Sequence, residues 1–134
     1  MWFRFLSISV LHWTFSYVVF ALLSIYVFVG LRGILLAFPI WIINFLLSFG
    51  FATWAFQKRL PGKRDGVMFL TIWFVTTFSL QVAVEMMQYG YVYFLIQDYY
   101  LHVQYVIDVI AILSAVYITR RKKIAAVLGE GMME

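Results

Sequence analysis

The sequence has no cysteine and very few charged residues, and each shortage excludes a class of protein. Without cysteine there can be no disulfide, no thiolate nucleophile and no cysteine metal site. Only 12% of the 134 residues are charged and 65% are hydrophobic, whereas about 25% of a soluble domain is charged. The composition therefore predicts an integral membrane protein, and a chain of this length provides about four spans of roughly 20 residues each with no sizeable domain outside the membrane.

Motifs of enzyme chemistry are also missing. The chain has no HExxH, no GxSxG, no glycine-rich phosphate loop and no pair of carboxylates at catalytic spacing on one helix. Its two histidines, His12 and His102, lie far apart and belong to no metal-ligand motif. We therefore predict a protein that is not an enzyme, that needs no cofactor or metal and that has no nucleic-acid partner.

What the chain does have is long apolar runs. They predict transmembrane helices at about residues 5–27, 35–56, 67–87 and 101–119 of a single membrane domain that covers 1–134. The N-terminal run has no small-residue cleavage site after it, so we expect it to remain as the first span. The segment Gly30-Leu31-Arg32-Gly33 predicts a tight turn between the first two spans.

The two halves of the chain resemble each other at an offset of sixty-four positions. Residues 41–47 (WIINFLL) return as 105–111 (YVIDVIA), and this alignment places Asn44 on Asp108. Each half would then be a helical hairpin with one polar residue deep in its second helix.

The ends of the two halves correspond as well, since the basic segment 57–59 aligns with 121–123. We therefore predict an all-α membrane fold of four transmembrane helices, arranged as two tandem, parallel-oriented helical hairpins. Repeat one covers 3–59 and repeat two covers 67–123. Repeats with polar residues at matching depth are typical of transporters, in which similar halves form a site between them.

Charge predicts the orientation of the helices. Eight of the ten cations lie between the second and third spans or after the fourth span: Lys58, Arg59, Lys63, Arg64, Arg120, Arg121, Lys122 and Lys123. Only Arg32 lies in a loop on the opposite side. Because positive loops stay in the cytoplasm, we expect a multi-pass protein of the cytoplasmic (inner) membrane with both termini cytoplasmic. Membrane lipids with anionic headgroups would attract both basic clusters.

Three polar residues fall deep inside the predicted spans, where hydrocarbon makes them costly unless they are paired. Asn44 either fastens helices together or lines a polar path. Asp108 is expected to be protonated or hydrogen-bonded, with Asn44 as a candidate partner if the repeats bring their helices together. Its role could be functional or purely structural. His12 is either a neutral histidine bonded to a neighbouring helix or a proton-handling group.

The third span carries Gln81, Glu85 and Gln88, whose spacing of four and three residues places them on one helical stripe. Glu85 falls close to the predicted outer boundary, where a carboxylate costs less than at the bilayer centre. Residues 89–100 follow with five tyrosines, a pattern typical of an aromatic belt at the membrane interface.

Several short motifs resemble those of the GtrA family of small four-helix membrane proteins. They are Phe3-Arg4-Phe5-Leu6 before the first span, Leu35-Leu36-Ala37 and Ile43-Asn44-Phe45-Leu46-Leu47 in the second, Trp54-Ala55-Phe56-Gln57-Lys58-Arg59 at its exit, Met68-Phe69-Leu70 in the third, and the basic cluster after the fourth. The resemblance covers nearly the whole chain. It implies translocation, or flipping, of polyprenyl-phosphate-linked sugars across the membrane for glycosylation of cell-surface polysaccharides.

Applied to these residues, the implied function assigns a role to each candidate. Arg4 would hold the phosphate with help from the loop cations. His12, Asn44 and Asp108 would offer the sugar hydrogen-bonding partners midway, and a stripe on the third span would receive it near the outer face: Gln81, Glu85 and Gln88. Four helices are few for such a path, so we expect a homo-oligomer or a partner glycosyltransferase.

Two alternative functions remain at this point. The chain could be a membrane anchor or accessory subunit of a glycosyltransferase. It could also be a small-ion channel, because Asn44 followed by Thr76-Thr77-Phe78-Ser79 is similar to fluoride channels of the CrcB type. The glycines that precede the Thr-Phe-Ser break in those channels are replaced here by Ile72-Trp73-Phe74-Val75.

Overall fold

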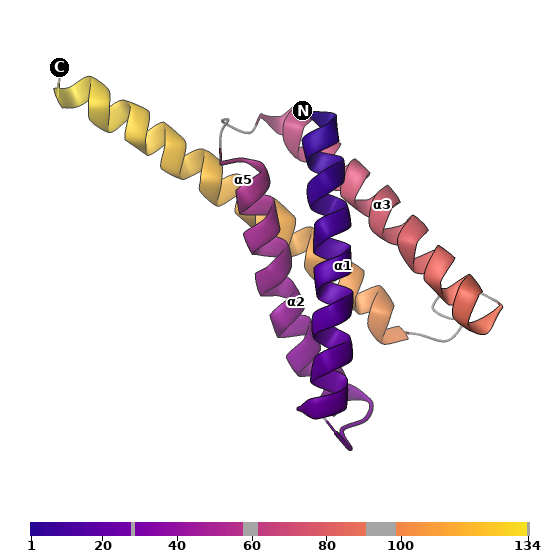
Figure 1. The fold of residues 1–134 in the computed structure, drawn as a ribbon. Coiled ribbons are helices and arrows are strands. Elements are labelled where there is room, and N and C mark those ends of the chain that lie inside the picture. The colour runs from indigo at the N-terminus through magenta and orange to yellow at the C-terminus, as the bar shows by residue number, and fades with distance from the viewer. Residues whose placement is uncertain (28, 58–61, 91–98, 134) are drawn as a thin grey trace.

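The computed structural model describes residues 1–27, 29–57, 62–90 and 99–133, and every regular element within them is an α-helix (Figure 1). The helices are α1 (Trp2–Tyr26), α2 (Ile34–Ala55), α3 (Lys63–Tyr89) and α5 (Tyr99–Met133). Each contains a stretch that is long and apolar enough to cross a membrane. The prediction of an all-helical chain with four helices of spanning length is confirmed, and this form suits a multi-pass membrane protein.

Glycine allows the chain to reverse between α1 and α2. Gly30 and Gly33 have φ angles of +85° and +59°, which residues with a side chain rarely adopt. The Gly33 carbonyl accepts the N–H groups of Leu36 and Ala37 at 3.2 and 3.0 Å, and these bonds start α2. Pro39 follows in the second turn of α2, near the helix end, where the loss of a backbone donor disrupts little.

The closest packing joins helices that are not neighbours in the chain. α2 packs most extensively against α5, and α1 packs most extensively against α3. α1 and α2 share a smaller contact, and α3 and α5 touch only slightly. Figure 1 shows that α1 and α3 run in one direction whereas α2 and α5 run in the opposite direction. Helices at the same position in the two predicted repeats therefore lie against each other.

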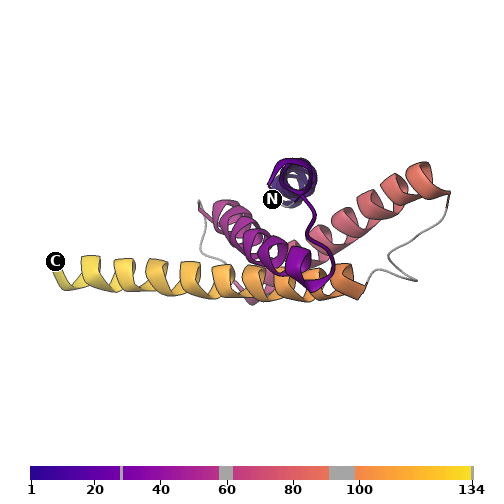
Figure 2. The same ribbon diagram turned by 90° about the horizontal axis from the view of Figure 1, so that it is seen from below.

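α5 is much longer than its predicted span. The segment 101–119 forms its first part, and the helix then continues through the basic residues 120–123 to Met133. Arg, Lys, Ala and Leu all favour helix, so nothing in this segment stops the helix where its charge begins. Figures 1 and 2 show the end of α5 projecting past the other three helices.

The apolar core lies toward the end of the bundle where α1 begins. Phe5, Phe56 and Phe69 meet edge to face there, with ring centroids 5.1 to 5.6 Å apart. Ala52 and Ala115 are fully buried beside them, because small side chains allow helices to approach closely. This aromatic cluster, made of Phe5, Phe56 and Phe69, closes one end of the bundle.

Candidate functional site

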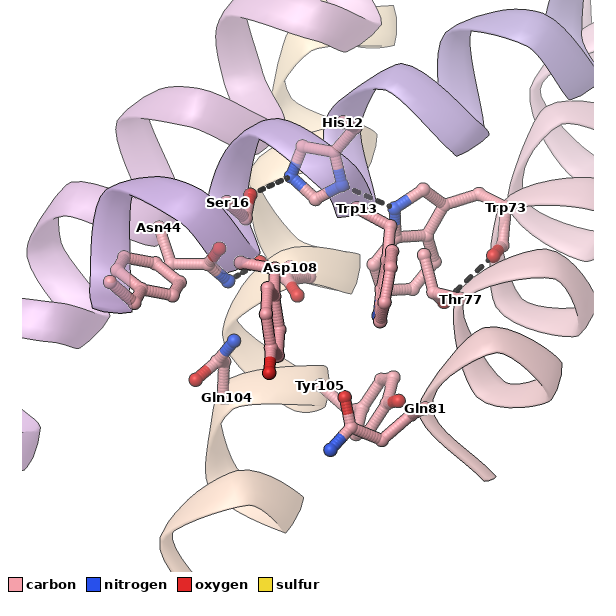
Figure 3. Close-up of a pocket in the computed structure, with 12 residues that line it drawn as sticks. His12, Trp13, Ser16, Asn44, Trp73, Thr77, Gln81, Gln104, Tyr105 and Asp108 are labelled. Carbon is pink, nitrogen blue, oxygen red and sulfur yellow. Dashed lines mark hydrogen bonds between the residues drawn. The ribbon is translucent and has the colours of Figure 1, made fainter. Parts of the chain in front are cut away.

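A chain of hydrogen bonds crosses the centre of the bundle and uses all four helices. The Trp73 indole of α3 donates to His12 Nδ1 of α1 at 3.2 Å. His12 Nε2 lies 3.0 Å from the Ser48 hydroxyl of α2, which donates to Asp108 Oδ1 of α5 at 2.6 Å. Asn44 Nδ2, one turn before Ser48 on α2, donates to the same carboxylate oxygen. We call these five residues the central network, and Figure 3 shows four of them: His12, Asn44, Trp73 and Asp108.

The direction of each bond follows from the indole at one end. An indole nitrogen can only donate, so His12 Nδ1 must carry a lone pair, and the proton of a neutral imidazole is then on Nε2. Nε2–H donates to Ser48, which leaves the serine hydroxyl proton for Asp108. Ser16 Oγ lies 3.4 Å from the same Nε2 as a second neighbour. His12 is thus hydrogen-bonded to α2 and α3, which fits the predicted role of a neutral histidine bonded to a neighbouring helix.

Asp108 and Asn44 are the polar centre of the network. Their side chains are 4% and 0% exposed, although both would lie deep in the membrane. The predicted hydrogen bond between them is present. Asn44 Oδ1, in contrast, is buried and is bonded to no other described group. A buried carbonyl without a donor is unfavourable, so this atom is suited to accept a hydrogen bond from a ligand.

A cavity of about 120 Å³ adjoins the network, and twelve residues line it: His12, Trp13, Ser16, Tyr17, Phe20, Asn44, Trp73, Thr77, Gln81, Gln104, Tyr105 and Asp108. Figure 3 shows Gln81, Gln104 and Tyr105 on the side away from His12. Since about 15 Å³ of such space holds one water, this central cavity can hold several waters or a small polar group. Amides, hydroxyls, an imidazole and a carboxyl group provide it with both donors and acceptors.

The predicted stripe on α3 is only partly at this cavity. Gln81 lines it and donates to Glu85 Oε1 at 2.9 Å, one turn further along the helix. Glu85 is buried at 4% exposure. Gln88 is exposed and donates to the Tyr17 hydroxyl of α1 at 3.0 Å. The stripe therefore leads from the cavity toward the end of α3, with Gln88 joining α3 to α1.

Arg4 lies two turns of α1 before His12 and does not line the cavity. Its guanidinium donates to the carbonyls of Trp54 and Ala55, at 2.7 and 3.3 Å. Lys123 of α5 donates to the next two carbonyls, of Phe56 and Gln57, at 2.6 and 3.0 Å. The last carbonyls of a helix have no partner within it, and cations near them are favourable. Both cations therefore cap α2 and tie it to α1 and α5.

Some site residues were not among the predicted ones. Ser48 lies four residues after Asn44 and so shares its helical face, which is the signal that could have identified it. Trp73 carries no such signal, because an indole in an apolar run is ordinarily a packing residue. Lys58, Arg59 and the tyrosine-rich segment 91–98 lie outside the described residues.

No protein family, curated protein or solved structure matches the chain. The resemblance to the GtrA family therefore stays a prediction. Function has to be inferred from the residues of the central network and its cavity.

Proposed function

We propose that the protein translocates polyprenyl-phosphate-linked sugars across the cytoplasmic membrane, for glycosylation of cell-surface polysaccharide. The observation that supports this proposal most strongly is the central cavity, because it gathers hydrogen-bonding groups where four spanning helices meet. A sugar has a hydroxyl on most of its carbons and cannot cross hydrocarbon unless those groups are satisfied. Asn44, Asp108, Gln81 and Gln104 offer such partners. The polyprenyl chain can remain in the lipid throughout.

The interior of the bundle is apolar toward one end and polar toward the other, so a path through it would be closed at the apolar end. The aromatic cluster closes the end at which α1 begins, and the central cavity lies beyond it toward the start of α5. In the proposed orientation both termini are cytoplasmic, so this arrangement is closed to the cytoplasm. Rocking of one tandem hairpin against the other would separate Phe69 from Phe5 and Phe56 and open that side.

The phosphate needs cations at each headgroup layer. On the cytoplasmic side Arg4 and Lys123 lie beside the end of α2, and they would exchange their carbonyl partners for phosphate oxygens as a substrate arrives. Lys63 and Arg64 lie in the first turn of α3, in the same predicted headgroup layer. Gln81, Glu85 and Gln88 would receive the sugar on the other side. A second copy of the chain, or a partner glycosyltransferase, would complete the enclosure of the path.

A second candidate is an accessory subunit that holds a glycosyltransferase at the membrane. The part of α5 beyond residue 123 favours it, because this segment leaves the bundle and exposes apolar side chains: Ile124, Val127, Leu128 and Met132. Such a surface could contact a partner. In this case the protein would bind the enzyme and would not move the lipid.

Translocation can be measured in proteoliposomes that contain a polyprenyl-phosphate sugar with a fluorescent label on the sugar. A reductant that cannot cross the membrane bleaches only the label in the outer leaflet. If the protein exchanges the lipid between leaflets, the reductant bleaches the label that began in the inner leaflet as well. A useful control is Thr71→Leu, which removes an exposed hydroxyl bonded only within α3. Bleaching confined to the outer leaflet with wild-type protein would contradict translocation and leave the accessory role.

A further inference from the structure

A second hollow lies on the surface of the bundle between α2 and α5. Its volume is about 280 Å³, and its lining is almost entirely apolar: Phe38, Trp41, Ile42, Phe45, Leu46 and Ile107. Phe38 and Leu46 are 60% and 63% exposed, so the hollow opens to whatever surrounds the bundle. In a membrane it would face the lipid chains. We call it the apolar groove.

The apolar groove adjoins a third hollow of about 250 Å³, because Trp41 lines both. This vestibule is lined by Gly33, Leu36, Ala37, Ile40, Trp41, Tyr100 and Gln104. The Trp41 indole donates to the Tyr100 carbonyl at 3.2 Å, and this bond fixes the ring between the two hollows. Arg32 immediately precedes Gly33 in the turn, so a cation lies next to the vestibule in the sequence.

Gln104 lines both the vestibule and the central cavity, so its side chain lies between these two hollows. The three hollows thus form a series that becomes more polar from the bundle surface to its centre. The groove and the vestibule share Trp41 as a lining residue, and the vestibule and the central cavity share Gln104. This increase in polarity suits an amphiphilic lipid. Its apolar chain would stay at the surface of the bundle while its polar head passes between α2 and α5.

We propose that the apolar groove binds the polyprenyl chain of the substrate while the sugar reaches the central cavity past Gln104. This inference rests on the proposed function and adds the route between the helices. Phe38, Trp41 and Phe45 present rigid aromatic surfaces to a methyl-branched, unsaturated chain. The phosphate would lie in the vestibule near Arg32. An ordinary phospholipid could also place a chain in the groove, but its headgroup would have no reason to enter between the helices.

Photo-crosslinking tests where the chain binds. In proteoliposomes, a photoreactive phenylalanine analogue in place of Leu46, in the groove, should crosslink to radioactive polyprenyl phosphate and so make the protein radioactive. The same residue at Val75 is the matched control, because Val75 is 58% exposed, lies near the middle of α3 and lines none of the three hollows. Labelling should be strong at Leu46 and weak at Val75, and excess unlabelled polyprenyl phosphate should compete where phosphatidylglycerol does not. Equal labelling at both positions, or equal competition by phosphatidylglycerol, would overturn the proposal.

A groove-filling variant separates this inference from the proposed function. Ile42→Trp should cause a loss of competition by polyprenyl phosphate, because the larger ring occupies the space in which the chain makes its van der Waals contacts. The Ile42 side chain is half exposed, so the variant should still fold. Unchanged thermal stability in detergent would confirm that it does. If Ile42→Trp translocates and competes like wild type, the groove is not the chain site although translocation stands. If wild type labels at Leu46 but does not translocate, the groove binds the lipid and the proposed function fails.

Discussion

Asn44 and Asp108, sixty-four positions apart in the sequence, are joined by a hydrogen bond between α2 and α5 at the centre of the bundle. They are the same two residues that the predicted internal repeat aligns. Each is almost completely buried, and both line the central cavity. The pair therefore connects the helices and also presents polar atoms to a ligand. Variants of Asn44 and Asp108 can show whether the pair matters for stability, for ligand binding or for both.

The protonation of His12 is a direct consequence of the central network. Because Trp73 donates to Nδ1, the imidazole should be in the neutral Nε2–H form. Nitrogen-15 NMR of the labelled histidines in detergent micelles distinguishes the two tautomers. Trp73→Phe removes the donor and should shift His12 toward a mixture of tautomers.

The other histidine is the internal control, since His102 lies on the exposed side of α5 and its signal should not respond to Trp73→Phe. A His12 signal that reports the Nδ1–H form in wild type would contradict the donor directions assigned to the whole network.

The cations at the end of α2 should contribute to stability as well as to any phosphate site. Arg4→Ala and Lys123→Ala should each lower the free energy of unfolding by about 1 kcal/mol, because each removes charged hydrogen bonds to carbonyls at the end of α2. Lys122→Ala is the matched control, since Lys122 is exposed and adjacent to Lys123. Equal stability of all three variants, measured by thermal unfolding in detergent, would show that the caps contribute nothing.

The orientation of the helices can be tested with single cysteines, because the chain has none of its own. Cysteines in place of Gly62 and Met132 should be shielded from an impermeant thiol reagent in intact cells. One in place of Val29, which is 71% exposed in the turn between α1 and α2, should react. Labelling at Gly62 without labelling at Val29 would reverse the proposed orientation.

The sequence predicted the four helices well because their signal is composition, which needs no knowledge of packing. The end of α5 was not predictable in this way, since the change from apolar to basic at residue 120 marks where hydrophobicity ends and not where the helix ends. The contact between Asn44 and Asp108 could be anticipated from the repeat. A polar residue in hydrocarbon needs a partner, and the aligned position offered one.

Other parts of the site depend on packing that no pattern reports. In the sequence, Trp73 is one of several aromatic residues in an apolar run. Its hydrogen bond to His12 depends on the packing of α1 against α3. The sequence marks Arg4 as a candidate phosphate ligand, whereas its bonds to the α2 carbonyls depend on how α1 and α2 cross. The groove and the vestibule likewise exist only because α5 lies along α2.

The two roles of the Asn44 and Asp108 pair predict different results for single and double variants. Asn44→Leu and Asp108→Leu each leave a buried polar partner behind, so each should lower stability, by about 1 kcal/mol for a bond of this kind in a membrane bundle. The double leucine variant removes both partners and should recover part of that loss, since only the Ser48 hydroxyl then lacks the acceptor that Asp108 provided.

The most direct test of the account is therefore sugar-lipid translocation by the double variant Asn44→Leu/Asp108→Leu in the proteoliposome assay. We predict a stable protein that leaves the inner-leaflet label unbleached, because the central cavity has lost two of the four side chains proposed to hydrogen-bond the sugar. Thr71→Leu should translocate normally beside it. A double variant that is stable and bleaches both leaflets at the wild-type rate would contradict the claim that sugars cross through this site.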